Sequence, residues 1–111
     1  MINNDDLDIF AHVKEQNPQW NDTQVWTDVS MQREIEDAVE KGIVDGNNIT
    51  GEVFQLIVKK AHIWIERNLP DILEKVAGFF ESLLSNIGEW ISHGLHWIMN
   101  ALGDLVSNLS F

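Results

Sequence analysis

Apolar residues recur every three or four positions along most of this chain, the spacing that places them on one side of an α-helix. Asp5 or Asp6 is suited to cap a short first helix. That helix is expected to end at Asn17, because the residue before a proline avoids helical dihedral angles. Its apolar side carries Leu7, Phe10 and Val13.

A second helix is predicted over residues 28–41, after a turn that opens at Asp22 or Thr23 and carries Val25, Trp26 and Val29. Gly42 follows the helix directly and is the residue type that most often terminates one. Residues 45–48 have the composition of a turn. The apolar side of the second helix consists of Met31, Ile35, Ala38 and Val39.

A middle helix is predicted over residues 51–69, with Thr50 as its N-cap and Glu52 in its first turn. Further apolar residues, Ile63 among them, widen its stripe and indicate that it is covered on more than one side. Pro70 marks a break, and a new helix is expected to begin there because proline is tolerated in a first turn. The main apolar stripe of the middle helix consists of Val53, Phe54, Ile57, Ala61, Trp64 and Ile65.

The last segment, residues 70–111, keeps helical phase from Ile72 to Leu109 without a slip, which predicts one long amphipathic helix over about residues 71–109. A helix of about 38 residues would be roughly 57 Å long at 1.5 Å per residue. Residues 85–88 are the best candidate for a break, but the continuous phase argues against a hairpin there. The sequence thus predicts an all-α protein with two short N-terminal helices, a middle helix and this long C-terminal helix.

The opposite face of the predicted C-terminal helix carries small uncharged polar residues and histidines instead of the usual mixed charges. Both faces are therefore expected to meet other surfaces, and glycines such as Gly88 and Gly94 fit a close approach of another backbone or a break. A helix of this kind is found in the core of a helical bundle, at the seam of a homodimer, in a larger assembly or in contact with a membrane. The predicted contact residues are Phe79, Phe80, Leu84, Ile87, Ile91, Trp97, Ile98, Leu102 and Leu105.

Charge separates the two halves of the 111-residue chain, which is long enough for one small domain. Residues 1–50 hold 11 acids and 3 bases, whereas residues 51–111 hold 7 acids and 4 bases, for a net charge of −11. This balance argues against binding to nucleic-acid phosphates, which needs a basic footprint. The acidic N-terminus is unlike a signal peptide, and no stretch reaches the length of a membrane span, so we expect a cytoplasmic protein or one exported without a cleaved signal.

The residues that carry catalytic or metal chemistry form no recognisable motif. There is no cysteine, nucleophile elbow, phosphate-binding loop or zinc-protease motif, so we predict no catalytic residues, cofactor or enzymatic activity. Glu89, His93 and His96 would share one helix face and supply half of a metal site. Because few other histidines remain to complete it, no metal site is predicted.

These patterns favour a non-enzymatic interaction or assembly protein. We expect it to self-associate as a homo-oligomer or to dock on a protein partner, in solution or at a membrane surface, through the C-terminal helix. The alternative is a small acidic inhibitor that blocks a nucleic-acid-binding protein by placing carboxylates where phosphates would lie. Its candidate acids are Asp22, Asp28, Glu34, Glu36, Asp37, Glu40 and Asp45.

Overall fold

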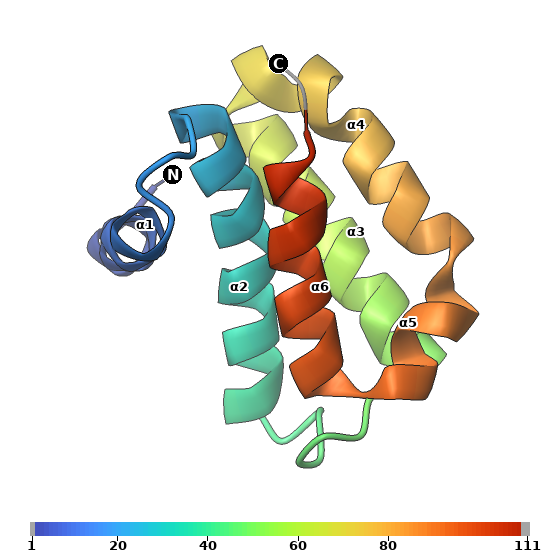
Figure 1. The fold of residues 1–111 in the computed structure, drawn as a ribbon. Coiled ribbons are helices and arrows are strands. Elements are labelled where there is room, and N and C mark those ends of the chain that lie inside the picture. Colours follow the sequence, from blue (N-terminus) through green and yellow to red (C-terminus); the bar gives the residue numbers. More distant parts are fainter. Residues whose placement is uncertain (1, 110–111) are drawn as a thin grey trace.

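A computed structural model describes residues 2–109, which form six α-helices and confirm the all-α prediction (Figure 1). Met1, Ser110 and Phe111 lie outside the described residues, so the last two positions of the predicted 70–111 segment are not placed. The helices are α1 (Asn4–Gln16), α2 (Asp22–Glu40), α3 (Gly51–Asn68), α4 (Pro70–Ser85), α5 (Ile87–His93) and α6 (Leu95–Ser107).

The two N-terminal helices begin at asparagine caps that the apolar spacing did not reveal. Asn3, not Asp5 or Asp6, caps α1, and its side chain and that of Asp6 each accept a hydrogen bond from the other residue's backbone N–H. Asn21 and Gln24 make the same reciprocal pair, with both N···O distances at 2.9 Å. The second helix is therefore one continuous element of 19 residues, longer than predicted.

The signals around the middle helix are confirmed. The Thr50 hydroxyl accepts a hydrogen bond from the Val53 N–H and caps α3. Pro70 occupies the first turn of α4, directly after α3 has ended. Gly42 follows α2 with a φ of 72°, a dihedral angle that glycine adopts without strain.

The prediction of one long C-terminal helix is wrong, because the segment divides into α4, α5 and α6 at Asn86 and Gly94. A continuous helix over this segment would extend well beyond the molecule, whose dimensions are 31 × 27 × 26 Å. Two bends let the apolar residues of the segment pack against α2 and α3 instead. The first break lies within residues 85–88, the range predicted as the best candidate. Helical phase continues across both breaks, which is why spacing favoured a single helix.

The second bend depends on a loop that is distant in sequence. Gly94 has a φ of 88°, which side-chain-bearing residues rarely adopt. The Asn47 backbone carbonyl accepts a hydrogen bond from the Leu95 N–H at 2.9 Å, and its side-chain Oδ1 accepts one from the His96 N–H at 2.8 Å. Asn47 thus acts as the N-terminal cap of α6 from outside the helix.

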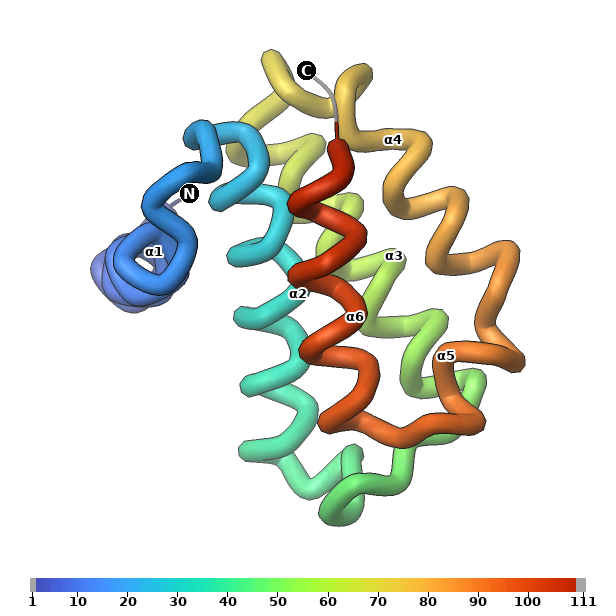
Figure 2. Tube along the Cα trace, in the orientation of Figure 1, coloured from blue at the N-terminus to red at the C-terminus, as the bar shows by residue number. Residues whose placement is uncertain are grey.

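Helix α2 packs along both α3 and α6, and Figure 2 traces the course of the three helices. These three helices contribute most of the core residues. Polar contacts join the end of α6 to the start of α2 and to the turn before it: Gln24 Nε2 donates to the Val106 carbonyl, and Trp20 Nε1 donates to Ser107 Oγ. Helices α4 and α5 cover α3, while α1 packs mainly on α2. Across residues 2–109, none of the helices combines the length and apolar character needed to cross a membrane.

Candidate interaction surfaces

The nine predicted contact residues differ in how far the fold buries them. Four lie in the hydrophobic core with no more than 3 % of their surface exposed, so in this fold they are not available to a partner. Four are half-buried, and Trp97 is exposed at 37 %. The core residues are Phe79, Phe80, Ile98 and Leu102, and the half-buried residues are Leu84, Ile87, Ile91 and Leu105.

Two of the half-buried residues, Ile87 and Ile91, pack against the first residue of α3. A Cβ atom on Gly51 would lie 3.4 Å from Ile87 Cγ2 and 3.6 Å from Ile91 Cδ1. Their contacts therefore hold α5 against α3 within the chain. The surface that remains on the C-terminal segment centres on Trp97.

An aromatic corner, formed by Trp90, His93 and Trp97, lies where α5 meets α6. The Trp97 ring stacks on His93 at 4.1 Å between ring centroids and meets Trp90 edge-on at 5.5 Å. Trp90 in turn stacks on the core residue Phe54 at 5.9 Å. The exposed Trp97 ring is thus held in one orientation by a chain of aromatic contacts that reaches the core.

An apolar stripe continues from this corner along α6. Trp97, Ala101 and Leu105 follow one another at four-residue spacing and so lie on one side of the helix. Ala101 and Leu105 are half-buried. Met99, which is 36 % exposed, lies on the other side of α6. We call Trp97, Ala101 and Leu105 the α6 stripe.

The histidines of the C-terminal segment do not assemble a metal site among the residues that the structure describes. His93 ends α5 and stacks on Trp97, whereas His96 lies in the first turn of α6, beyond the Gly94 bend. The single helix face that would have aligned Glu89, His93 and His96 does not exist.

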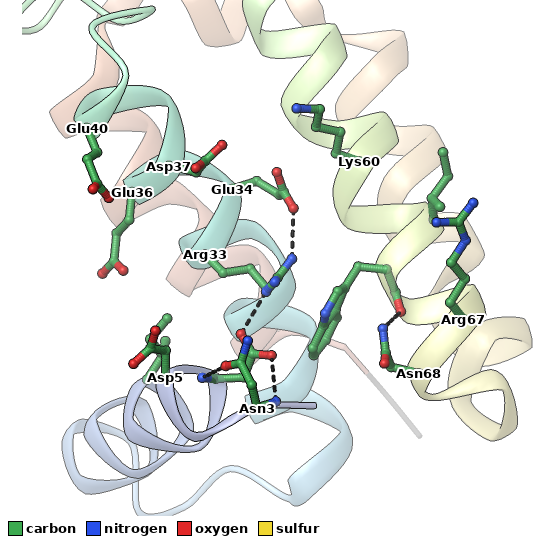
Figure 3. A pocket seen from close by; sticks show the side chains of 14 residues that line it. Asn3, Asp5, Arg33, Glu34, Glu36, Asp37, Glu40, Lys60, Arg67 and Asn68 are labelled. Carbon is green, nitrogen blue, oxygen red and sulfur yellow. Dashed lines mark hydrogen bonds and ion pairs between the residues drawn. The ribbon is translucent and has the colours of Figure 1, made fainter. Parts of the chain in front are cut away.

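An open groove of about 750 Å³ lies between the start of α1, the second half of α2 and the outer face of α3. Apolar atoms of Ile9, Ile63 and Trp64 line it, and Ile63 is 44 % exposed. The groove has two charged walls, shown on opposite sides of Arg33 in Figure 3. The acidic wall consists of Asp5, Glu36 and Glu40, and the basic wall of Lys60 and Arg67.

Arg33 lies between the two walls, and its guanidinium is already bound by two carboxylates of the same chain. Its Nε donates to Asp6 Oδ1 at 2.9 Å, and its guanidinium donates to Glu34 Oε1 at 2.8 Å. The guanidinium carbon also lies 4.8 Å from the centre of a Trp64 ring. By contrast, none of the five wall residues takes part in a salt bridge within residues 2–109. Their charges remain available at the surface.

Four of the seven candidate acids line this groove, and three do not. The sequence did not reveal Asp5 as part of the acidic wall, nor the basic wall or the apolar lining. The four are Glu34, Glu36, Asp37 and Glu40, and the other three are Asp22, Asp28 and Asp45. The signal was present in α3, where Ile63 lies outside the main apolar stripe, between Lys60 and Arg67. The sequence did not indicate that α1 and α2 would face this side of α3.

Asp28 is the most unusual carboxylate of the fold. It is 6 % exposed, and no hydrogen bond or salt bridge to its side chain is formed within residues 2–109. Burial raises its pKa to about 6, because the apolar surroundings disfavour the charged form. It lies one helical turn after Gln24, whose side chain contacts α6.

No known protein-family model matches this chain, and neither a characterised protein nor a solved structure is detectably similar to it.

Proposed function

We propose that this protein is a non-enzymatic interaction protein that pairs with a second copy of itself through the aromatic corner and the α6 stripe. The observation that carries the proposal is the exposed ring of Trp97, fixed between His93 and Trp90. Tryptophan is among the residues that most often dominate the binding energy of protein interfaces. A ring that is already held in place loses little conformational freedom when a partner covers it.

The charge of the protein favours a second copy as the occupant of this surface. Two molecules of net charge −11 repel one another most where their carboxylates face each other. The segment from Val76 to Phe111 contains only Glu81, Glu89 and Asp104 as charged residues, so repulsion is smallest there. A two-fold pair would place the same patch of each molecule against the other.

The alternative of an acidic inhibitor that mimics nucleic acid has less support. Glu36 and Glu40 of α2 do lie on the surface beside the groove, but Asp28 is buried, and Lys60 and Arg67 border the same surface. A positively charged nucleic-acid-binding site would be repelled by these bases. The acidic surface is thus interrupted where a phosphate mimic would need uniform charge.

Sedimentation equilibrium over a wide range of protein concentration tests the proposal. We expect the average mass to rise from 12.7 kDa, the mass of one chain, toward twice that value. Trp97→Ser should abolish the rise, because it removes the exposed anchor. Met99→Ser is the matched control, since Met99 has similar exposure on the other side of the same helix.

Three results would contradict pairing at this surface. The wild-type mass could stay at that of one chain throughout, or Trp97→Ser could associate as the wild type does. The third is flotation of the protein with anionic liposomes without any self-association, which would point to a membrane as the occupant instead.

A further inference from the structure

The interhelical groove is built from α1, α2 and α3, whereas the pairing surface belongs to α5 and α6. The two surfaces share no residue, so a protein paired through α6 would keep the groove accessible. The groove combines an apolar strip with two walls of opposite charge, and this combination limits what fits it.

We infer that the groove binds a helical segment of a partner protein that carries basic residues along one edge and acidic residues along the other. The basic edge would face Asp5, Glu36 and Glu40, and the acidic edge would face Lys60 and Arg67. Apolar side chains between the edges would cover Ile63 and the groove-lining atoms of Trp64. This is the helix-in-groove mode of recognition, in which spaced apolar anchors lie in a trough.

The charges point to this occupant because the walls do not neutralise each other. Lys60 and Arg67 form no salt bridge across the groove within the described part of the chain, and neither do Glu36 and Glu40. The central Arg33 is satisfied by Asp6 and Glu34, so it does not compete for a ligand carboxylate. A ligand that supplies both signs, each on the correct side, therefore gains on both walls.

The apolar strip of the groove indicates that the ligand also carries apolar side chains. Ile63 is 44 % exposed although it lies in the middle of α3, between turns that carry the basic wall. Trp64 is buried next to it and forms part of a tilted aromatic series with Trp26 and Phe10. These contacts fix the shape of the groove, so a ligand would meet a preformed surface.

Three synthetic peptides of about 18 residues, about 27 Å long as helices, test this inference. They share one apolar face and differ only in their edges: lysine on one and glutamate on the other, glutamate on both, or lysine on both. We expect the mixed peptide to bind more tightly than the glutamate peptide by about tenfold or more in isothermal titration. NMR amide shifts should change in α1, the second half of α2 and α3.

Charge-reversed variants separate groove binding from general attraction to an acidic protein. Glu36→Lys with Glu40→Lys should weaken the mixed peptide by about tenfold and strengthen the glutamate peptide. Glu81→Lys with Glu89→Lys changes the net charge equally on exposed sites of α4 and α5, and should leave both affinities near their wild-type values. Ile63→Ser should weaken all three peptides, because it removes apolar contact without opening the core.

The inference is overturned if the mixed and glutamate peptides bind wild type equally or not at all. It is also overturned if the groove and control variants change affinity alike, or if the lysine peptide binds at least as well as the mixed peptide. Shift changes confined to α6 would equally contradict it. The same titrations are repeated with Trp97→Ser protein, which we expect to be monomeric, so that peptide binding is measured separately from self-association.

Discussion

Asn47 occupies the space that a side chain at Gly94 would need. A Cβ atom on Gly94 would lie 2.3 Å from Asn47 Nδ2 and 3.0 Å from its backbone oxygen. The same Asn47 accepts hydrogen bonds from the first two N–H groups of α6. The loop after α2 therefore sets both the position of the bend and the start of the last helix.

Gly94→Ala should destabilise the protein by about 2 kcal/mol or more, because its φ of 88° and the contact with Asn47 both disfavour a side chain. Urea denaturation measures the change in the free energy of unfolding. Gly78→Ala is the control: it lies inside α4 with open space around it, and should stabilise by up to about 1 kcal/mol. Equal effects at both sites would contradict the close approach.

Asn47→Ala should cost about 1 kcal/mol, the usual effect of removing a side-chain helix cap. The loss should appear as faster amide exchange at His96, whose N–H would lose its acceptor. Asn48→Ala removes a neighbouring exposed amide that caps no helix, and should leave exchange in α6 unchanged. Slow exchange at His96 in the Asn47 variant would show that another group caps α6.

Asp28→Asn should stabilise the protein at pH 7 and flatten its pH dependence. The pKa of Asp28 is raised from 3.8 to about 6 in the fold, so between these values the unfolded chain loses a proton that the folded chain retains. Folding consequently becomes less favourable as the pH rises through this window. The resulting loss of folding free energy reaches about 3 kcal/mol above pH 6, and it is absent below the ordinary pKa of the carboxyl group.

Urea denaturation at several pH values between 4 and 7 checks this sign. Wild type should gain stability as the pH falls from 7 toward 4, and the gain should shrink in Asp28→Asn. Asp104→Asn removes an exposed carboxylate of α6 and should retain the wild-type slope. A wild-type stability that falls over the same range, with Asp28→Asn unchanged at pH 7, would show that Asp28 is not penalised by burial.

Arg33→Ala should loosen α1 from the rest of the fold. It leaves the Asp6 carboxylate, 3 % exposed, without its cationic partner, a change that typically costs about 3 kcal/mol. Limited proteolysis should then cut within residues 4–21 at a rate that wild type does not show. Lys41→Ala breaks an exposed pair with Asp37 and should change neither stability nor cleavage.

Local signals in the sequence were sufficient to predict where a helix begins or ends when nearby residues determine that position. Thr50 and Pro70 mark the starts of α3 and α4, and Gly42 follows the end of α2, as predicted. The N-cap of α2, Asn21, was not predicted, although this asparagine and the glutamine three residues later form a recognisable capping box.

Gly94 was recognised as compatible with a close approach or a break, but the neighbouring residues could not show which, because its partner Asn47 lies far away in sequence. Helical phase continues through the bend, so periodicity supported a single helix. The groove could not be predicted from the sequence for a related reason. Its walls come from three helices, and the side of α2 that faces Lys60 depends on how α2 and α3 pack.

The contact between Asn47 and Gly94 also bears on the order in which the protein folds. It joins residues separated by nearly half of the chain, so closing this loop costs more conformational entropy than forming a helical hairpin from α2 and α3. We expect the hairpin to form early and α6 to dock after the transition state. Gly94→Ala would then mainly accelerate unfolding and leave the refolding rate nearly unchanged, so the bend would govern how long the native state survives.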